Sequence, residues 1–556
     1  MSATYFRIRG GTVYDPANNI DGEVRDVWID GDRIVAPPTD RATRPAKEID
    51  ATGLVVMPGA IDMHCHIAGP KVNMARKMRP EDRRDAEPFV RGNGWPSGTG
   101  GGMPSTFATA YQYAGLGYTT AFDAAIPPIA ARHVHEEFED TPCLDKGFFV
   151  LVGNHHYILD VLAQRDPAQL RNALAWILRS TRGFAPKLVN PGGVEQWKQH
   201  NDAASHGLDD PIAGFGVTGR QIVSGLSQAA AELGLPHPVH VHANRLGMPG
   251  NWRTTLETMR ALEGRRGHLT HIQFHSYAGG AGDETTFGSA VQPLVEYFNQ
   301  HENITVDVGQ VLFGATTSMT GDGPLGYYLH QIYGTKWYSG DTELESGCGI
   351  VPIEYKQKSL VHAWQWAVGL EWYLTVNDPW RIAMSTDHPN GGSFLAYPEI
   401  IRLLMDSAYR REIVAGLPRV VREQSVLRDL DREYSLREIC ILTRAAPARI
   451  LGLKTKGHLG PGADADLTLY APKANRAEMF QLPRYVIKGG RTIVDDAQVQ
   501  PPISGKTLHV APEFDEERES RIDEWFNQHY TIRFNNYAVD EQYLAANETV
   551  ACEPNL

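Results

Sequence analysis

Apolar residues follow two different patterns along the chain. Between residues 58 and 454, apolar runs of strand length alternate with stretches of helical period, which is typical of parallel β/α units. The runs fall at 54–66, 118–124, 147–153, 184–189, 237–243, 268–276, 303–310 and 381–387. Parallel strands that are covered on both faces read as such continuous runs. Eight of them predict an α/β fold with a closed (β/α)8 barrel of the TIM type.

Stretches of helical period lie between these runs. They predict helices over 167–181, 219–233, 253–263 and 359–374, and another helix that ends over 445–451. Gly452 follows that last helix as a C-terminal stop. The stretch 314–350 is rich in glycine and tyrosine and shows neither period, so it predicts a long irregular loop of the kind that is usually functional.

Both ends of the chain contain short strands instead. Asp30-Gly31 stands between β-forming residues and predicts a hairpin, and alternating runs return at 464–470 and 485–494. We therefore predict that 1–57 and 455–511 form one small composite β-sandwich beside a barrel over 58–454. Residues 512–556 are first acidic and then aromatic, and we expect this C-terminal extension to contact another subunit, with a loosely packed terminus as the alternative.

The composition is that of an ordinary globular protein, with 42% hydrophobic and 21% charged residues. A net charge of −13 without a basic stripe argues against a nucleic-acid partner. The five cysteines are scattered without a CxxC, and no apolar run approaches the roughly 18 residues of a membrane span. The N-terminus also lacks the apolar core of a signal peptide. We therefore expect a cytoplasmic protein with reduced thiols and no membrane partner.

The first barrel run ends in two histidines, His64 and His66. Side chains two residues apart on a strand point to the same face, so both rings can reach one ion. A lone His-x-His pair more often reflects packing. Here it follows a long apolar run and a Pro-Gly pair, which favours metal binding by imidazole nitrogens.

The fourth run contains a lysine, Lys187, between Pro186 and Leu188. A solvated lysine is the ordinary interpretation. In this run, however, the amine would be partly desolvated, and desolvation favours its neutral form. A neutral amine can react with CO₂ to give a carbamate, and this anion can bridge two metal ions.

The fifth and sixth runs each carry two histidines that share a face if the strands are regular. These are His240 and His242 on the fifth run and His271 and His275 on the sixth. At most one from each strand is needed as a metal ligand, and the other would support the ligands or contact substrate. We favour His242 and His275, because they lie nearest the C-terminal ends of their strands, where barrel active sites form.

The eighth run ends at a carboxylate, Asp387. The surrounding sequence is turn-like, so Asp387 is either a turn residue or a metal ligand that also carries a proton. Asn190, Asn244 and Arg245 follow the fourth and fifth runs, and we expect them to support the ligands or contact substrate.

The ordered set His-x-His, Lys, His, His and Asp resembles the amidohydrolase superfamily. The segment from Pro447-Ala448 through KGHLGPGADADL resembles the C-terminal part of its dihydropyrimidinase-like members. Longer segments resemble the A-type subunits of formylmethanofuran dehydrogenases and of bacterial formyltransferase/hydrolase complexes. These segments are HIAGPKVNMARKMRPEDRRDAEP, KLVNPGGVEQWK, HVHANRLGMPGNW, HLTHIQFHSYAG and STDHPNGGSF.

The resemblance implies two Zn²⁺ ions. Its ligand sets are His64, His66 and Asp387 for one ion, His242 and His275 for the other, and N6-carboxylysine, formed from CO₂ at Lys187, as the bridge. It further implies partner subunits of a formyltransferase/hydrolase complex and methanofuran, a formyl-carrying furfurylamine cofactor. The implied reaction is zinc-dependent hydrolysis of N-formylmethanofuran to formate and methanofuran in one-carbon metabolism, with Asp387 as general base and then acid.

Three alternatives stay open at this point. The same site could run in the condensing direction within a formylmethanofuran dehydrogenase. The chain could be a cyclic-amide hydrolase of the dihydropyrimidinase type. It could also be a metal-free scaffold subunit, although a scaffold has no physical need for a buried lysine among histidines. An excess of arginine over lysine inclines us towards the hydrolase.

Overall fold

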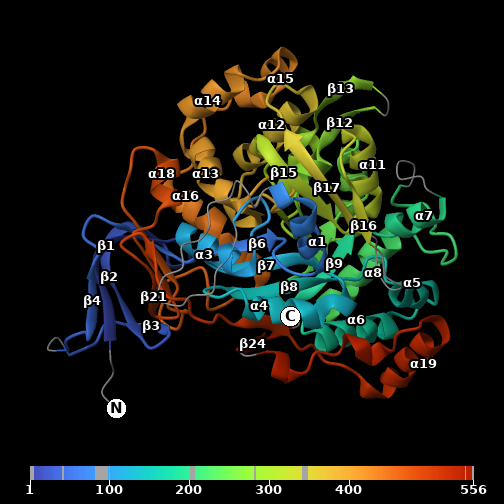
Figure 1. Cartoon of the computed structure of the whole chain (residues 1–556), viewed down its shortest axis with the longest axis horizontal. Coiled ribbons are helices and arrows are strands. Elements are labelled where there is room, and N and C mark those ends of the chain that lie inside the picture. Colours follow the sequence, from blue (N-terminus) through green and yellow to red (C-terminus); the bar gives the residue numbers. More distant parts are fainter. Residues whose placement is uncertain are drawn as a thin grey trace.

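The computed structural model consists of a barrel, a smaller sheet and a C-terminal segment (Figure 1). It describes residues 5–40, 43–81, 98, 100–200, 207–280, 283–340, 348–544 and 546–553. In Figure 1 the small sheet lies at the left, beside the barrel, and the C-terminal helix α19 lies below the barrel at the right. None of the helices in these ranges has the length and apolarity that crossing a membrane requires.

Eight parallel strands form the barrel. They are β6 (Ala60–Cys65), β7 (Tyr118–Ile126), β8 (Asp145–Leu151), β9 (Ala185–Val189), β10 (Val239–His242), β11 (Gly267–Leu269), β14 (Ile304–Asp307) and β18 (Ile382–Ala383). Each neighbouring pair from β6 to β18 is parallel. The chain just after β6 closes the ring, because the His66 amide donates to the His388 carbonyl at 2.8 Å. The predicted barrel is confirmed, and all C-terminal strand ends meet on one side.

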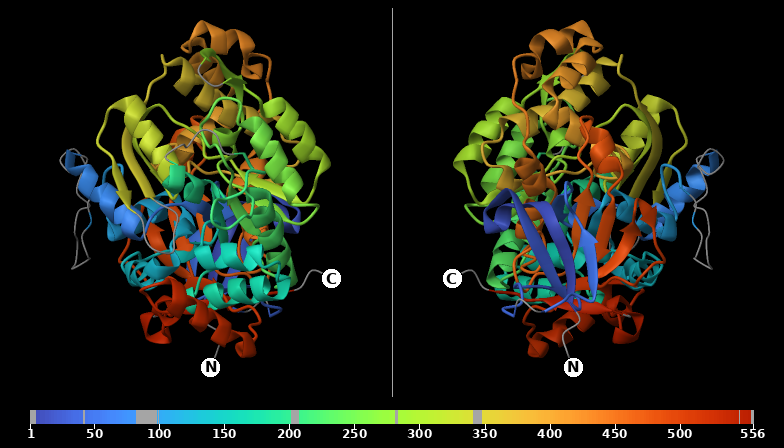
Figure 2. Two further views of the ribbon diagram at one scale, coloured as in Figure 1. Left: turned by 90° about the vertical axis from the view of Figure 1, so that its right-hand side faces the viewer. Right: turned by 90° about the vertical axis from the view of Figure 1, so that its left-hand side faces the viewer.

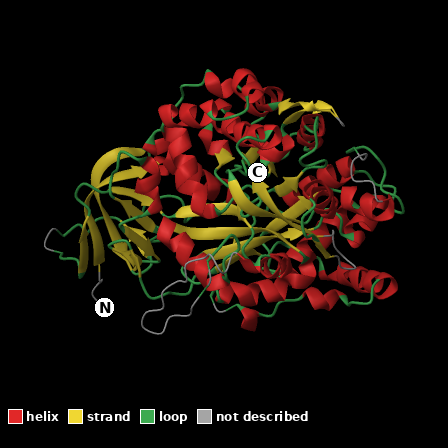
Figure 3. Ribbon diagram, turned by 45° about the horizontal axis from the view of Figure 1, so that its top comes forward, coloured by secondary structure: helices red, strands yellow, loops and turns green. Residues whose placement is uncertain are grey.

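Helices surround these strands (Figure 3). They include α3 (Thr106–Leu116), α4 (Ala131–Glu139), α5 (His156–Ala163), α6 (Pro167–Thr181), α8 (Gly219–Glu232), α9 (Trp252–Ala261), α10 (Val291–Gln300), α12 (Leu360–Thr375) and α17 (Ala446–Leu451). Further helices are α1 (Pro70–Met78), α7 (Gly193–His200), α13 (Tyr397–Met405), α14 (Ser407–Ala415), α15 (Arg419–Gln424), α16 (Leu436–Cys440) and α18 (Arg476–Gln481). The predicted helices are confirmed, and α17 stops at Gly452, whose φ of 71° suits glycine.

Two strand predictions need correction. The run 54–66 divides at Gly59: β5 (Val55–Pro58) belongs to the small sheet, and only β6 enters the barrel. The run 268–276 ends as a strand at Leu269 and continues into a 3₁₀ helix over Ile272–His275. At this point His271 has a φ of 35°, and its amide donates to the Asp307 carboxylate at 3.0 Å instead of a neighbouring strand. Strand alternation therefore does not apply to His271 and His275.

The two ends of the chain form one nine-stranded sheet. Its strands are β1 (Tyr5–Asp15), β2 (Ile20–Asp30), β3 (Arg33–Val35), β4 (Lys47–Asp50), β5, β19 (Leu467–Tyr470), β20 (Tyr485–Lys488), β21 (Arg491–Asp495) and β22 (Gln498–Val499). The antiparallel pair β5 and β19 joins the two ends. The right-hand view of Figure 2 shows the N-terminal strands in blue beside the C-terminal strands in orange.

One strand of the predicted composite domain lies elsewhere. Residues Thr507–Val510 form β23, which pairs with β8 of the barrel and with β24 (Asn547–Val550), so this part of 455–511 belongs to the barrel sheet. The bond from the Lys146 amide to the Lys506 carbonyl, at 2.8 Å, fixes this attachment. The sequence pattern of a short strand does not indicate which of two sheets the strand joins.

The predicted irregular loop at 314–350 is wrong for the residues that the structure describes. They form β15 (Gly314–Thr320), α11 (Gly323–Tyr333), β16 (Tyr338–Gly340) and β17 (Cys348–Tyr355), while 341–347 lie outside the described residues. The three strands make an antiparallel sheet in the order β15-β17-β16. A separate hairpin consists of β12 (Tyr277–Gly280) and β13 (Asp283–Ser289).

The C-terminal extension packs against its own barrel. Helix α19 (Glu519–His529) places the Trp525 indole N–H 2.7 Å from the Asp160 carboxylate of α5. Phe526 and Tyr537 both contact Trp176 of α6, with ring centroids 5.5 Å apart in each case. These aromatic side chains are buried within the chain itself. The expected contact with another subunit stays a prediction for the exposed side chains of the extension.

Candidate active site

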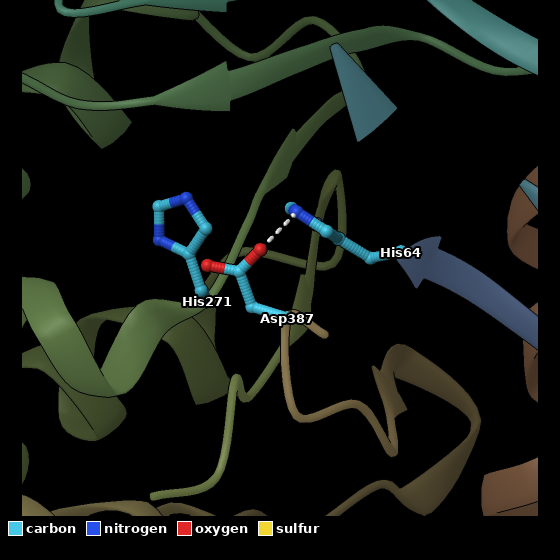
Figure 4. Close-up of side chains that lie close together, drawn as sticks. All are labelled: His64, His271 and Asp387. Carbon is cyan, nitrogen blue, oxygen red and sulfur yellow. Dashed lines mark ion pairs between the residues drawn. The ribbon is translucent and has the colours of Figure 1, made fainter. Parts of the chain in front are cut away.

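The end of β6 brings His64 and His66 to Asp387. Both histidines direct Nε2 towards Asp387 Oδ1, at 3.0 Å and 3.2 Å. Asp387 follows β18 in a left-handed conformation with φ 51°, and its amide is held by the Ser385 hydroxyl at 3.1 Å. Because the backbone turns at this residue, its carboxylate lies between the rings of His64 and His271, as Figure 4 shows.

Lys187 lies inside β9 and is 1% exposed. Its neighbours across the sheet are Leu151 on β8 and His240 on β10. Among the described residues, the Lys187 Nζ atom has no hydrogen-bond partner. Burial lowers the pKa of this amine to about 7, although Asp387 and Asp307 act in the opposite direction. A large fraction of the lysine is therefore neutral near pH 7.

The sixth strand presents His271, and not His275, to this cluster. Ligand atoms of His64, His271 and Asp387 all lie within 4.8 Å of one another. His271 lines the cavity described below, as does His242 at the end of β10, and their ring centroids are 4.7 Å apart. His275 stacks behind His271 at 5.2 Å and does not line the cavity.

Three carboxylates that sequence reasoning missed hold the histidines. Asp307 accepts from His64 Nδ1 at 3.1 Å, Asp123 lies 3.7 Å from His66 Nδ1, and Asp322 lies 3.1 Å from His242 Nε2. Asp307 and Asp123 end or interrupt apolar barrel runs, which is the same signal that marked Asp387. Asp322 gave no signal, because it belongs to the stretch predicted as a loop.

The expected supporting residues lie around the fifth strand. Asn190 donates to Asp322 at 3.1 Å, and Asn244 donates to Asn190 at 2.9 Å, so both asparagines hold Asp322. The carbonyl of Arg245 accepts from the Asn251 amide group at 3.1 Å, and the Arg245 side chain does not line the cavity. His240 points into the barrel interior, where its Nε2 lies 3.1 Å from His64 Nδ1.

A cavity of about 380 Å³ opens over these residues. Its buried polar lining includes His64, His66, Lys187, His242, His271 and Asp387, and also Ser318, Thr320, His362 and Asn390. Its apolar wall comes largely from α11 and β17 and includes Leu325, Tyr328, Leu329, Tyr333, Ile353 and Tyr355. Ile332 at the edge of this wall is 57% exposed, so the cavity reaches solvent there. A mostly apolar pocket with a few converging polar groups is the usual form of a small-molecule site.

The charges of the cluster fit a cation. Although burial favours the neutral histidine, Asp307 and Asp387 raise the pKa of His64 to about 9. Burial also opposes ionisation of Asp387, yet His64 and His271 hold the pKa of this carboxyl well below its usual range. His64 thus faces a carboxylate at each ring nitrogen, Asp307 at Nδ1 and Asp387 at Nε2, and this surplus of negative charge favours a bound proton or metal ion between Nε2 and Asp387.

The unpaired atoms support the same conclusion. Among the described residues, Lys187 Nζ and His271 Nδ1 are buried without a hydrogen-bond partner, and Asp387 Oδ1 faces the Nε2 atoms of both His64 and His66. Leaving polar atoms unpaired in a buried site costs free energy, so their convergence indicates that this site binds a ligand. Imidazole nitrogens and carboxylate oxygens are suitable ligands for Zn²⁺. The residues present thus fit a metal centre.

The chain belongs to the amidohydrolase family, whose model matches residues 47–494. It is 43% identical to protein FwdA of Methanocaldococcus jannaschii over 96% of this chain and 97% of that protein. It is 40% identical to the A-type subunit of the formyltransferase/hydrolase complex Fhc of Methylorubrum extorquens, over 98% of this chain and 99% of that relative. The predicted resemblance is therefore confirmed.

Solved structures agree with this family. The crystal structure of the formyltransferase/hydrolase complex FhcABCD from Methylorubrum extorquens, with methylofuran bound, matches with a TM-score of 0.93 and 38% identity. That match covers 99% of this chain and 100% of the other. A dihydropyrimidinase from Brevibacillus agri, 16% identical over 92% of this chain and 100% of that one, matches with a TM-score of 0.51 and shares the fold.

Proposed function

We propose that this chain hydrolyses an N-formyl amide to formate and a free amine, as the A-type subunit of a formyltransferase/hydrolase complex. The carrier would be methanofuran or a related furfurylamine such as the methylofuran of the solved complex. One observation carries the proposal: six side chains with nitrogen or oxygen atoms that could bind or bridge metal ions line one cavity at the C-terminal side of the barrel. The likeness to the A-type subunit of Fhc over nearly the whole chain supports the choice of substrate class.

The ligand set that we propose differs at one position from the set expected from the sequence. His64, His66 and Asp387 would hold one Zn²⁺, and His242 would hold the second. His271 supports the second site better than His275 does, because it lines the cavity and lies beside Asp387. The carboxylated Lys187 would bridge the two ions.

The carbamate follows from the state of Lys187. A neutral amine has a lone pair that can attack CO₂, and the nitrogen then loses a proton to leave the carbamate anion. Burial, with a pKa of about 7, supplies that neutral amine near physiological pH. The anion would also replace an unpaired buried nitrogen with oxygen ligands, which removes the cost of leaving Nζ without a partner.

Two bound metal ions would supply a hydroxide at neutral pH and a positive charge for the formyl oxygen. Asp387 would move the proton. Its carboxylate is ionised in this site and can accept the proton of the attacking water. It would then return that proton to the amide nitrogen, because an amine leaves readily only when it is protonated. The products are formate and the amine.

The apolar wall supports a flat, ring-bearing substrate. Tyr328, Tyr333 and Tyr355 line the cavity together with aliphatic side chains. Aromatic side chains of this kind pack well against a planar ring such as furan. The open edge near Ile332 would let a longer carrier tail reach solvent. We further propose that the chain works in the cytoplasm with its partner subunits.

The condensing direction is the second candidate, because segments of the sequence also resemble A-type subunits of formylmethanofuran dehydrogenases. The same groups serve both directions, because a catalyst accelerates a reaction equally both ways. Which direction prevails depends on the partner subunits and on the concentrations of formate and carrier. Isolation of the native complex with identification of its subunits would decide this point.

The direct test is an assay of the purified complex on a formylated furfurylamine carrier, with formate as the measured product. We expect formate release with that substrate and none with hydantoin or dihydropyrimidine. Metal analysis should find about two zinc ions per chain. Turnover of the cyclic amides, or a protein that stays inactive and metal-free in the presence of zinc, would contradict the proposal.

A further inference from the structure

A column of imidazoles runs down the barrel interior from the metal ligands. His64 Nδ1 lies 3.1 Å from His240 Nε2, and His240 Nδ1 lies 3.0 Å from His237 Nε2. His237 Nδ1 then lies 3.0 Å from the carbonyl of Ile450 in α17. All three rings are at most 1% exposed. The column uses both nitrogens of His237 and His240, so each hydrogen bond constrains the next.

The lower end fixes the direction of these hydrogen bonds. A carbonyl oxygen only accepts, so His237 Nδ1 must carry a hydrogen towards Ile450. Burial lowers the pKa of His237 well below its usual range, so the ring is neutral and its Nε2 accepts. That nitrogen receives the hydrogen of His240 Nδ1, and His240 Nε2 is left to accept from His64 Nδ1.

The upper end leads independently to the same assignment. Asp307 Oδ2 accepts from the Thr270 hydroxyl at 2.6 Å and from His268 Nε2 at 3.0 Å. The same oxygen lies 3.1 Å from His64 Nδ1. A carboxylate oxygen cannot donate, so the hydrogen of this contact also belongs to His64 Nδ1. His240 and Asp307, which lie on different strands, both accept from His64 Nδ1. Both contacts therefore place the ring hydrogen of His64 on Nδ1.

We propose that His240, backed by His237, acts together with Asp307 to lock His64 in the tautomer that carries its hydrogen on Nδ1. The lone pair of His64 then lies on Nε2, the nitrogen that faces Asp387 in the cavity. His240 is accordingly a positioning residue and not a metal ligand. This inference rests on the proposed metal centre, because a fixed lone pair matters only to a group that binds it.

The test compares metal affinity in matched variants of the full-length protein. His240→Phe removes the acceptor, and we expect the affinity of the metal-free protein for Co²⁺ to fall about 10–100-fold, with a changed visible spectrum of the bound Co²⁺. His240→Gln keeps an acceptor oxygen and should recover much of that affinity. His135→Phe is the control: His135 is equally buried and bonded to the Thr181 carbonyl at 2.9 Å, but it lies outside the column.

The outcomes separate this inference from the proposed function. If the wild type binds no Co²⁺, both are overturned. If the wild type binds Co²⁺ and His240→Phe binds it equally well with the same spectrum, only the tautomer lock is overturned. Should His240→Phe fail to fold, His237→Phe replaces it, because it removes the acceptor of His240. An affinity loss of about threefold or more is then expected, and unchanged affinity would overturn the lock.

Discussion

Two clusters of buried charged residues in this protein differ in whether their lysine is paired with carboxylates. At the junction of barrel and small sheet, Asp145, Asp464 and Asp466 surround Lys456, whose Nζ lies 2.8 Å from Asp464 and 2.9 Å from Asp466. Lys488 adds a second cation, 2.8 Å from Asp145. In the cavity, by contrast, Lys187 has no such partner among the described residues. Both clusters bring potential metal ligands together, but only at the junction does a buried lysine amine lie against the carboxylates.

The two lysines show what the difference means. Burial works against the charge of both. At the junction, however, Asp145, Asp466 and Asp464 raise the pKa of Lys456 well above its usual range, whereas in the cavity burial prevails and lowers the pKa of Lys187 to about 7. A charge cluster that supplies its own counter-ions fixes the fold and has no need of an external ion. A cluster with unpaired atoms is where a ligand and chemistry are expected.

The largest effect should follow from removing the cavity lysine. We expect Lys187→Ala to abolish formate release and to lower the zinc content, because the bridging ligand is lost. The fold should survive, since the buried amine makes no hydrogen bond among the described residues. Activity, metal analysis and circular dichroism would check this. Full activity in a variant that retains zinc would refute the carbamate bridge.

The next largest effect concerns the proton. Asp387→Asn is nearly the same size but cannot accept a proton, so kcat should fall about 10²–10⁴-fold while the fold persists. Steady-state kinetics of the metal-loaded variant would measure this. Asp322→Asn is a useful comparison, because Asp322 contacts His242 from outside the ligand cluster and should affect metal affinity more than kcat. A decrease of less than about tenfold for Asp387→Asn would argue against its role.

Removal of a buried lysine at the junction should lower the stability of the protein instead of its activity. Lys456→Met leaves Asp464 and Asp466 with less positive charge in a buried site, and we expect the free energy of unfolding to fall by about 3–5 kcal/mol. Denaturant titration would measure the loss. Folded molecules of this variant should keep their zinc and their kcat. Loss of zinc at full stability would mean that the two clusters are not separate in function.

The smallest effect is a dependence of the carbamate yield at Lys187 on pH. With a pKa of about 7, the neutral fraction of Lys187 rises from roughly a tenth at pH 6 to nine tenths at pH 8. Only the neutral amine reacts, so carbamate yield should rise over this interval at a fixed concentration of dissolved CO₂. Carbon-13 NMR of the metal-free protein with labelled CO₂ would detect it, and Lys187→Met serves as the blank. A yield that does not change with pH would contradict the lowered pKa.

The sequence predicted the fold better than the details of the site. Continuous apolar runs marked all eight barrel strands, because parallel strands are buried on both faces. The same runs placed Lys187 within a barrel strand, His242 at a strand end and Asp387 shortly after one, and all three line the cavity. The pattern failed at His271, where the backbone amide donates to the Asp307 side chain and the strand ends. It also failed in the described part of 314–350, where α11 and an antiparallel sheet contribute to the cavity wall.

The sequence by itself determined which chemical groups are present and in what order along the barrel. This is because periodicity and residue type indicate which segments form buried strands and which groups they contain. Only the tertiary structure decided which partner each group meets. It placed Asp307 against His64, His240 beneath it, and Asp145 against Lys456, and each of these contacts joins residues far apart in the chain. The charge and hydrogen position of a buried group depend on those contacts, so its function could be assigned only after folding had brought them together.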